Sequence, residues 1–166
     1  CVVEPENPLP GNPWIWRARF FGAFPSVDVE LLRRGFHLAH VGVADLYGSP
    51  RLLMPLWDAF YEYLVQEWYL AEKAVLEGFS RGGLPIYNWA SEHPDRVACL
   101  YGDAPVCDIR SWPGGKGKGK GSPQDWERCL GAYLLNEEQA MDFGSNPIDL
   151  LEPIVGAGIP IIHVCG

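Results

Sequence analysis

Short, largely apolar runs recur along this chain, separated by segments of mixed polarity. Continuous runs of this kind are typical of strands buried on both faces of a parallel sheet, whereas half-exposed strands alternate apolar and polar positions. Five strands are predicted on this pattern: residues 1–3, 36–43, 74–76, 97–101 and 161–164.

Between these runs, apolar positions recur at helical spacing or follow helix-start signals. Three helices are predicted there: residues 26–34, 49–64 and 82–93. Ser26 or Asp28 can cap the first and Gly35 can end it, while Ser49 followed by Pro50 is a good start for the second. Strands that alternate with helices in this order predict an α/β fold: a doubly wound, mostly parallel sheet with helices on both faces.

Residues 4–16 and 114–122 show neither pattern. The first segment is rich in proline, which excludes helix and regular ladder pairing, so we expect a stiff, extended loop. The second alternates glycine with lysine, which predicts a flexible surface loop. Phosphate binding by this loop stays open as an alternative, although the G-K-[ST] ending of a P-loop is absent.

The segment 122–143 is predicted to be a small helical excursion. Ser122-Pro123 and Asn136-x-x-Gln139 are both helix-start patterns. Because the chain has 166 residues, of which 48% are hydrophobic and 20% charged, we expect residues 1–166 to form a single domain.

Charge and cysteine content argue against several classes of protein. The net charge of −8 disfavours nucleic-acid binding, which needs a basic face. No apolar run approaches membrane-spanning length. The five cysteines are scattered without C-x-x-C spacing, which supports neither a metal site nor a disulfide framework.

Both ends of the sequence lie inside strand-like patterns, and there is no initiator methionine. We therefore interpret the chain as a fragment of a longer protein. On that interpretation the compartment, cytoplasmic or secreted, and the oligomeric state stay open.

One pentapeptide carries candidate chemistry. Residues 78–82, Gly-Phe-Ser-Arg-Gly, lie between a predicted strand and a predicted helix and fit the G-x-S-x-G nucleophile elbow. Such a turn holds Ser80 in a strained conformation, and Gly78 and Gly82 leave room for the neighbouring backbone. The following helix N-terminus would offer N–H groups to a developing oxyanion. The alternative is a structural turn with an incidental serine.

With this motif on this order of strands, the chain resembles the α/β-hydrolase superfamily over nearly its whole length. Residues 93–97, His-Pro-Asp-Arg-Val, resemble the family's link from the elbow helix to the next strand. Residues 13–22 and 45–49 resemble a group of uncharacterised bacterial α/β hydrolases.

The resemblance implies that Ser80 is the nucleophile and that the N–H of Arg81 is one oxyanion donor. The second donor is expected from the loop after the first strand. Trp14 is preferred there and Asn12 is the alternative, because the neighbouring prolines have no N–H to donate.

The family order of catalytic residues is serine, acid, histidine. The resemblance therefore places the acid just after the strand that leads to Gly166, with the histidine further on. Asp103, which follows strand 97–101, is a second candidate for the acid, although a structural role in its turn is preferred. We interpret the four histidines of this chain as structural: His37, His40, His93 and His163.

Other residues are expected around the substrate. Asp45 and Tyr47 end a strand on the same edge as Ser80 and are predicted to line the pocket. Arg17 and Arg81 are candidates for holding an anionic substrate group.

The sequence thus predicts a serine hydrolase that cleaves a small-molecule carboxylic ester through an acyl-Ser80 intermediate. No metal or organic cofactor, nucleic acid or membrane is implied, and the fragment itself is expected to be inactive. The alternative is a non-catalytic module that binds an anion or small ligand at the elbow helix N-terminus.

Overall fold

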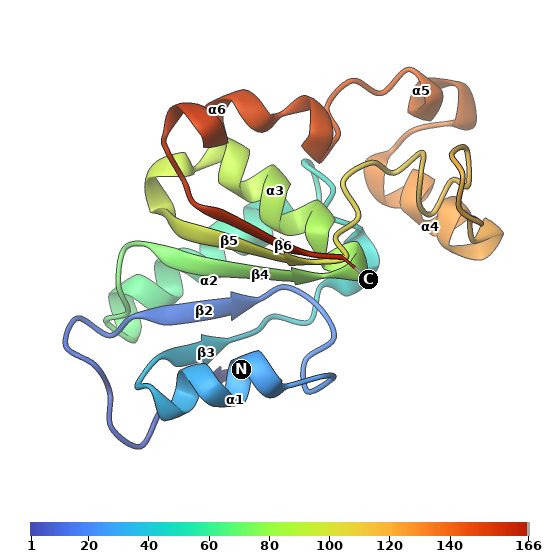
Figure 1. Cartoon of the computed structure of the whole chain (residues 1–166). Coiled ribbons are helices and arrows are strands. Elements are labelled where there is room, and N and C mark those ends of the chain that lie inside the picture. Colours follow the sequence, from blue (N-terminus) through green and yellow to red (C-terminus); the bar gives the residue numbers. More distant parts are fainter. Residues whose placement is uncertain (166) are drawn as a thin grey trace.

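The computed structural model describes residues 1–165, in which a single six-stranded sheet is formed (Figure 1). Its strands are β1 (Val2–Val3), β2 (Trp14–Arg17), β3 (His37–Ala39), β4 (Ala74–Phe79), β5 (Val97–Asp103) and β6 (Ile161–Val164). Their spatial order is β1-β3-β2-β4-β5-β6. β1 runs antiparallel to β3 and every other neighbouring pair is parallel, which confirms the mostly parallel sheet predicted from the sequence.

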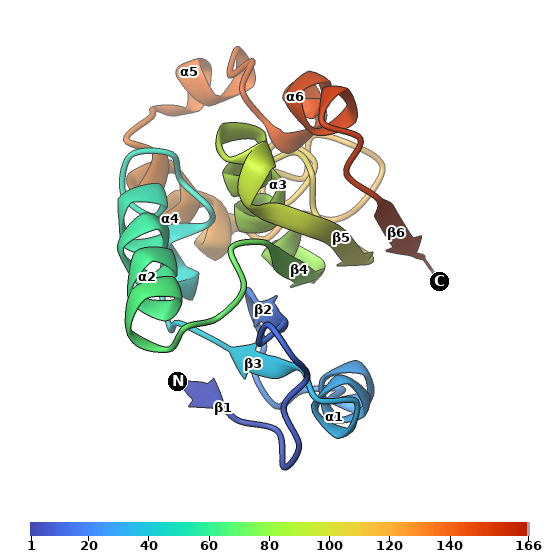
Figure 2. The same cartoon turned by 90° about the vertical axis from the view of Figure 1, so that its left-hand side faces the viewer.

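Helices cover both faces of the sheet, as predicted. They are α1 (Ser26–Arg33), α2 (Met54–Glu67), α3 (Gly83–Glu92), α4 (Pro123–Tyr133), α5 (Glu137–Met141) and α6 (Leu151–Gly156). α1 lies on one face, and α2, α3 and α6 lie on the other (Figure 2). α4 and α5 lie beyond the end of the sheet to which the strands point (Figure 1). None of the helices in residues 1–165 is long and apolar enough to cross a membrane.

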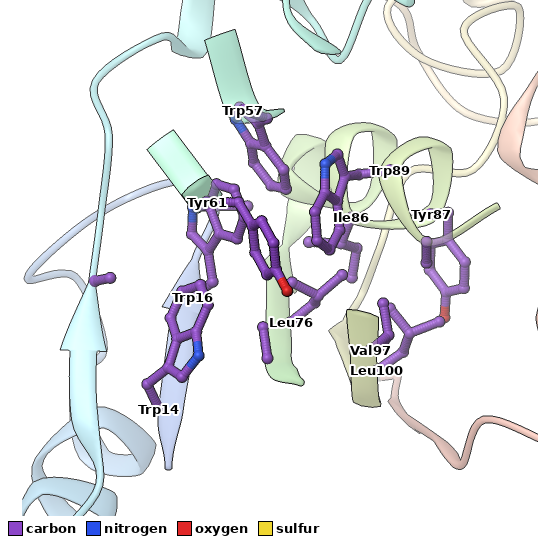
Figure 3. Close-up of a cluster of buried hydrophobic side chains, with 14 of the residues drawn as sticks. Trp14, Trp16, Trp57, Tyr61, Leu76, Ile86, Tyr87, Trp89, Val97 and Leu100 are labelled. Atoms are coloured by element: carbon purple, nitrogen blue, oxygen red, sulfur yellow. The ribbon is translucent and has the colours of Figure 1, made fainter. Parts of the chain in front are cut away.

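Aromatic rings fill the space between β2 and the helices α2 and α3 (Figure 3). Trp16 is at the centre and is fully buried. Its ring centroid lies 4.2 Å from that of Trp57, 5.3 Å from that of Trp89 and 5.5 Å from that of Trp14. Stacked and edge-to-face geometries at these distances add to the free energy gained by burial. β2 is thereby held rigidly in the middle of the sheet.

The sequence pattern does not predict β2. The extended loop expected over residues 4–16 ends instead at Pro13, and all four residues of β2 are buried. Four residues after a run of prolines are too few to show a strand period of their own. The consequence for the site is large, because β2 lies directly beside β4.

Helix starts are predicted with mixed success. Ser122 caps α4, and Asn136 and Gln139 form the expected capping box at α5. The helix predicted from Ser49 begins only at Met54. The Ser49 hydroxyl accepts the Leu52 N–H at 3.2 Å, so the residue caps a turn that precedes the helix.

Replacing Trp16 by alanine tests the importance of the aromatic core. We expect the variant to lose about 3–5 kcal/mol of unfolding free energy, because truncation leaves a cavity among the packed rings. Urea denaturation followed by tryptophan fluorescence measures the loss. The control is Tyr69→Ala, whose ring is 76% exposed. Equal losses in the two variants would contradict this description of the core.

Candidate active site

Ser80 lies where β4 meets α3. β4 ends at Phe79, residues Ser80–Gly82 form a 3₁₀ turn, and α3 begins at Gly83. Ser80 has a φ of +52°, the left-handed conformation that non-glycine residues rarely adopt. Its side chain is half-buried. The strand–turn–helix pattern predicts this strained geometry.

Two glycines make the tight turn possible. A Cβ on Gly78 would lie 2.6 Å from the carbonyl oxygen of Gly82, and a Cβ on Gly83 would lie 2.5 Å from the carbonyl oxygen of Val106. Both positions therefore require glycine. Gly82 is less constrained by its own turn, but a Cβ there would lie 3.2 Å from the Cβ of Arg19.

The segment beside Ser80 is the loop that follows β2. Arg17, the last residue of β2, is paired with Glu77, and the Ala18 N–H still donates to the Glu77 carbonyl at 2.9 Å. The chain then leaves the sheet. Arg19 comes to lie against Gly82, with its backbone nitrogen 3.8 Å from the position of a Gly82 Cβ.

The expectation that Trp14 or Asn12 is the second oxyanion donor is wrong. Trp14 begins β2 and lies level with Ala74 on β4, six residues before Ser80. At about 3.3 Å per residue, the separation is about 20 Å. Its indole N–H donates to the Ala71 carbonyl, and the Asn12 side chain donates to the Tyr69 carbonyl. Both residues lie at the opposite edge of the sheet, because β2 begins where a loop was expected.

Arg17 is not a pocket residue either, although the sequence suggests it. Its side chain is only 2% exposed. The guanidinium donates to the Glu77 carboxylate and lies 3.3 Å from the Asp28 carboxylate of α1. Its other N–H groups donate to the carbonyls of Arg19 at 3.0 Å and Ala23 at 2.7 Å. Arg17 thus holds the backbone of the loop beside Ser80 from inside the protein. Because its side chain is buried, a substrate cannot contact it.

This buried cluster contains two carboxyl groups and one guanidinium. Burial, followed by the nearby charge of Asp28, raises the pKa of Glu77 to about 8, although Arg17 opposes the shift. Burial is the larger cause, because a buried carboxylate loses its hydration, and one cation cannot neutralise two buried carboxylates. One proton is therefore retained in the cluster at neutral pH.

A second polar cluster surrounds Arg81. The Tyr47 hydroxyl donates to Asp125 at 2.5 Å, and Arg81 contacts both the same carboxylate oxygen at 3.1 Å and the Tyr47 hydroxyl at 3.3 Å. The Ser122 hydroxyl donates to the other Asp125 oxygen at 2.6 Å. Burial and the Asp125 hydrogen bond raise the pKa of Tyr47 to about 12. Hydrogen bonds from Ser122 and Tyr47 lower the pKa of Asp125, so the carboxylate stays charged.

Tyr47 is therefore near the predicted site, but it is only 2% exposed and supports Arg81. Asp45 is exposed on the turn Ala44–Leu46. Asp125 is the residue of the cluster around Arg81 that the sequence analysis does not identify. The signal available was its position three residues after the helix cap Ser122, which predicts a capping role and not a contact with Arg81.

Open space next to Ser80 is small. A cavity of about 10 Å³, the size of one water, is lined by residues that include Ala18, Arg19, Tyr47, Arg81 and Gly82. A larger cavity of about 620 Å³ lies between α3, α4, α5 and α6, and none of the predicted site residues lines it.

Comparisons with protein families and with curated proteins find no match to this sequence. Solved structures do match. S-formylglutathione hydrolase FrmB from Staphylococcus aureus has a TM-score of 0.66 and 14% identity, over 99% of this chain and 72% of that one. The N-acyl homoserine lactonase AidH, complexed with N-butanoyl homoserine, has a TM-score of 0.52 and 15% identity, over 99% of this chain and 84% of that one. The chain has an α/β-hydrolase fold.

Ser80 directly follows the last residue of β4 and therefore lies at the C-terminal edge of the parallel strands. Asp103 lies on this edge as well, since it ends β5 and is paired with Phe79, the neighbour of Ser80. Among residues 1–165, two backbone N–H groups of the turn after Asp103 donate to carbonyl oxygens: Ala104 to Val164 at 2.7 Å and Val106 to Ser80 at 2.9 Å. They are therefore not the donors to the Asp103 carboxylate that a structural role in this turn predicts.

The contacts of the four histidines are with groups other than the Ser80 hydroxyl. His40 is hydrogen-bonded to the Arg17 carbonyl at 2.8 Å, and His93 is 2.9 Å from the Asp58 carboxylate. His163 contacts the Tyr87 hydroxyl, and His37 is buried in β3. Within residues 1–165, no histidine is hydrogen-bonded to Ser80. The acid and the base expected after β6 fall outside the described residues.

Glu77→Gln tests the buried cluster around Arg17. Because the folded-state pKa of Glu77 is raised to about 8, the folded chain holds a proton that the unfolded chain releases near pH 4.5. The stability from this group is greatest below pH 4.5 and is lost as the pH rises through about 8. The glutamine variant has no such proton to lose.

We therefore expect the melting temperature of the parent chain to fall more steeply between about pH 5 and pH 9 than that of Glu77→Gln. Differential scanning calorimetry across this range measures both. Glu127→Gln, an exposed position on α4, is the control and should follow the parent. Identical pH profiles for the parent and Glu77→Gln would show that the buried cluster holds no extra proton.

Proposed function

We propose that this α/β-hydrolase-fold chain is the nucleophile-bearing part of a serine hydrolase that cleaves small-molecule carboxylic esters. The observation that carries the proposal is the positive φ of Ser80 at the end of a central parallel strand, with α3 directly behind it. A strained serine costs free energy, and such strain persists where it has a use. The two structural neighbours are a hydrolase and a lactonase, which belong to a compatible class of reaction.

Two backbone N–H groups are the proposed oxyanion donors. Arg81 directly follows the nucleophile in the turn before α3, where helix starts leave N–H groups unpaired. Arg19 is the second, in place of Trp14. Its N–H takes part in no backbone hydrogen bond of residues 1–165, and it lies beside Gly82.

The proposed reaction has two stages. An imidazole base takes the hydroxyl proton of Ser80 while its Oγ bonds to the ester carbonyl carbon, and the N–H groups stabilise the oxyanion. The bond to the alcohol then breaks, and the imidazolium gives its proton to the departing alcohol. Water, activated by the same base, hydrolyses the acyl-Ser80 and regenerates the hydroxyl. We propose that the base and its acid partner come from residues after Gly166.

The dependence on such a base gives a direct test. The 166-residue chain should hydrolyse p-nitrophenyl acetate slowly, because Ser80 keeps the weak nucleophilicity of an ordinary alcohol. A chain extended through the following acid and histidine should be faster by about 10³-fold or more. In that longer chain Ser80→Ala should remove the gain, whereas Ser91→Ala, a half-buried serine of α3, should keep it. A longer chain that is no faster, or that is indifferent to Ser80→Ala, would refute the proposal.

Asp103→Asn in the longer chain decides between the two candidate acids. We expect most of the turnover to remain, because the family order places the acid after β6. If Asp103 instead orients the histidine, kcat should fall by about 10⁴, as when the triad aspartate of a serine protease is replaced by asparagine. Steady-state kinetics distinguishes the two outcomes, provided that the melting temperature of the variant is unchanged. A fall in kcat of about 10⁴ would assign the acid to Asp103.

A further inference from the structure

Arg19 is a cation without a counter-ion at the edge of the Ser80 site. Among residues 1–165, ion pairs within 4.0 Å engage Arg17, Arg34, Arg81, Arg96 and Arg110, and none involves Arg19. Its Nε is buried and has no hydrogen-bond partner. A guanidinium that is partly withdrawn from water and left unpaired is costly, so its retention needs a reason.

Arg81 brings a second guanidinium to the same place. The Cζ atoms of Arg19 and Arg81 lie 4.9 Å and 5.8 Å from the centroid of the Phe20 ring. Arg81 is already balanced by Asp125, at 3.1 Å. Partial burial and the charge of Arg81 lower the pKa of Arg19, while Asp45, Tyr47 and Asp125 oppose the shift without reaching ion-pair distance. Within residues 1–165, Arg19 is thus the cation of this pair that no carboxylate balances at ion-pair distance.

This charge lies close to the proposed nucleophile. Arg81 is the next residue after Ser80, and Arg19 packs against Gly82 at the start of α3. Arg17 donates to the backbone carbonyl of Arg19, and the Arg81 side chain is held by Tyr47 and Asp125. A guanidinium can bind a carboxylate through two parallel N–H groups.

An apolar surface adjoins the two arginines. The Phe79 ring, next to Ser80 in the chain, packs edge-on against Phe20 at 5.3 Å and against Phe24 at 5.5 Å. Phe24 is 74% exposed and Phe21 is 43% exposed. Exposed aromatic side chains gathered in one place commonly mark a binding surface.

We propose that Arg19, supported by Arg81, binds an anionic carboxylate of the substrate, and that the aromatic residues of this loop contact an apolar part of the same molecule. The substrate class is then an ester that carries a free carboxylate in addition to the bond that is cleaved. This inference rests on the proposed function for its catalytic consequence, but the binding of the carboxylate does not require catalysis. The carboxylate can belong to the acyl part or to the alcohol part of the ester.

Binding is tested first, on the 166-residue chain, by ligand-observed NMR titration with 3-phenylpropanoate and its neutral isostere 3-phenylpropanamide. The carboxylate should bind at least about 10-fold more tightly than the amide, and 0.5 M salt should weaken that preference. Arg19→Gln should abolish the preference, and Arg19→Lys should restore part of it. Arg33→Gln is the matched control, because Arg33 is an exposed arginine of α1 that forms no ion pair in the described part of the chain, residues 1–165. Equal binding of the two ligands, or a preference that survives Arg19→Gln, overturns the proposal.

Kinetics on the longer chain then identifies the part of the ester that carries the charge. For the acyl part, mono(4-nitrophenyl) glutarate is compared with 4-nitrophenyl valerate. For the alcohol part, 4-acetoxybenzoate is compared with its methyl ester. In one of these pairs, Arg19→Gln should lower the ratio of kcat/KM for the anionic ester to kcat/KM for the neutral ester by about 10–100-fold, which corresponds to one lost charge-assisted contact.

The two proposals fail in different ways. Hydrolysis that depends on Ser80, with a ratio that Arg19→Gln leaves unchanged in both pairs, retains the hydrolase and overturns the substrate class. A carboxylate preference in the binding titration without hydrolysis of any ester retains the anion site and overturns the catalytic proposal.

Discussion

The arrangement around Ser80 depends on one buried ionic interaction, between Arg17 and the carboxyl groups of Glu77 and Asp28. It joins β2, β4 and α1, and Arg17 also holds the carbonyls of Arg19 and Ala23. A buried charge that loses its partner costs about 3–5 kcal/mol, so these residues cannot move independently. The path of the loop beside Ser80 is therefore set by charges beneath it that no substrate contacts.

The aromatic core and the polar clusters have separate roles. On one face of the sheet, Trp16 and its neighbouring rings fix β2 against α2 and α3 by burial and ring packing. At the C-terminal edge, Asp125 and Tyr47 position Arg81 through hydrogen bonds. Because Asp125 comes from α4, the helical segment after β5 completes the surroundings of Ser80. Directional contacts are needed there, since apolar packing alone does not fix the orientation of a guanidinium.

The loop beside Ser80 depends on strand register, which the local sequence pattern does not reveal. The motif around Ser80 is local, so its glycines and its strained turn can be inferred from neighbouring residues alone. The position of Trp14 is set by strand register, and a four-residue strand after a run of prolines carries too little pattern to reveal it. With β2 in place, the loop that flanks Ser80 starts at Ala18, and Arg19, not Trp14, lies against Gly82 in the turn after Ser80. Arg17 was a candidate for holding a substrate anion, but as the last residue of β2 its side chain is buried and supports the loop instead.

By itself the sequence determined the alternation of strands and helices, the mostly parallel sheet, and the strained turn at Ser80 with Gly78 before it, whereas the need for glycine at position 83 comes from the contact with Val106. These features follow from periodicity and from steric limits that act over a few residues. The tertiary structure alone decided which charges meet. Arg17 pairs with Glu77 of β4 and with Asp28 of α1, and Arg81 pairs with Asp125 of α4. Arg19 forms no ion pair within residues 1–165. Ion pairs between distant segments depend on how the elements pack, and the order of residues along the chain does not encode that packing in any local pattern.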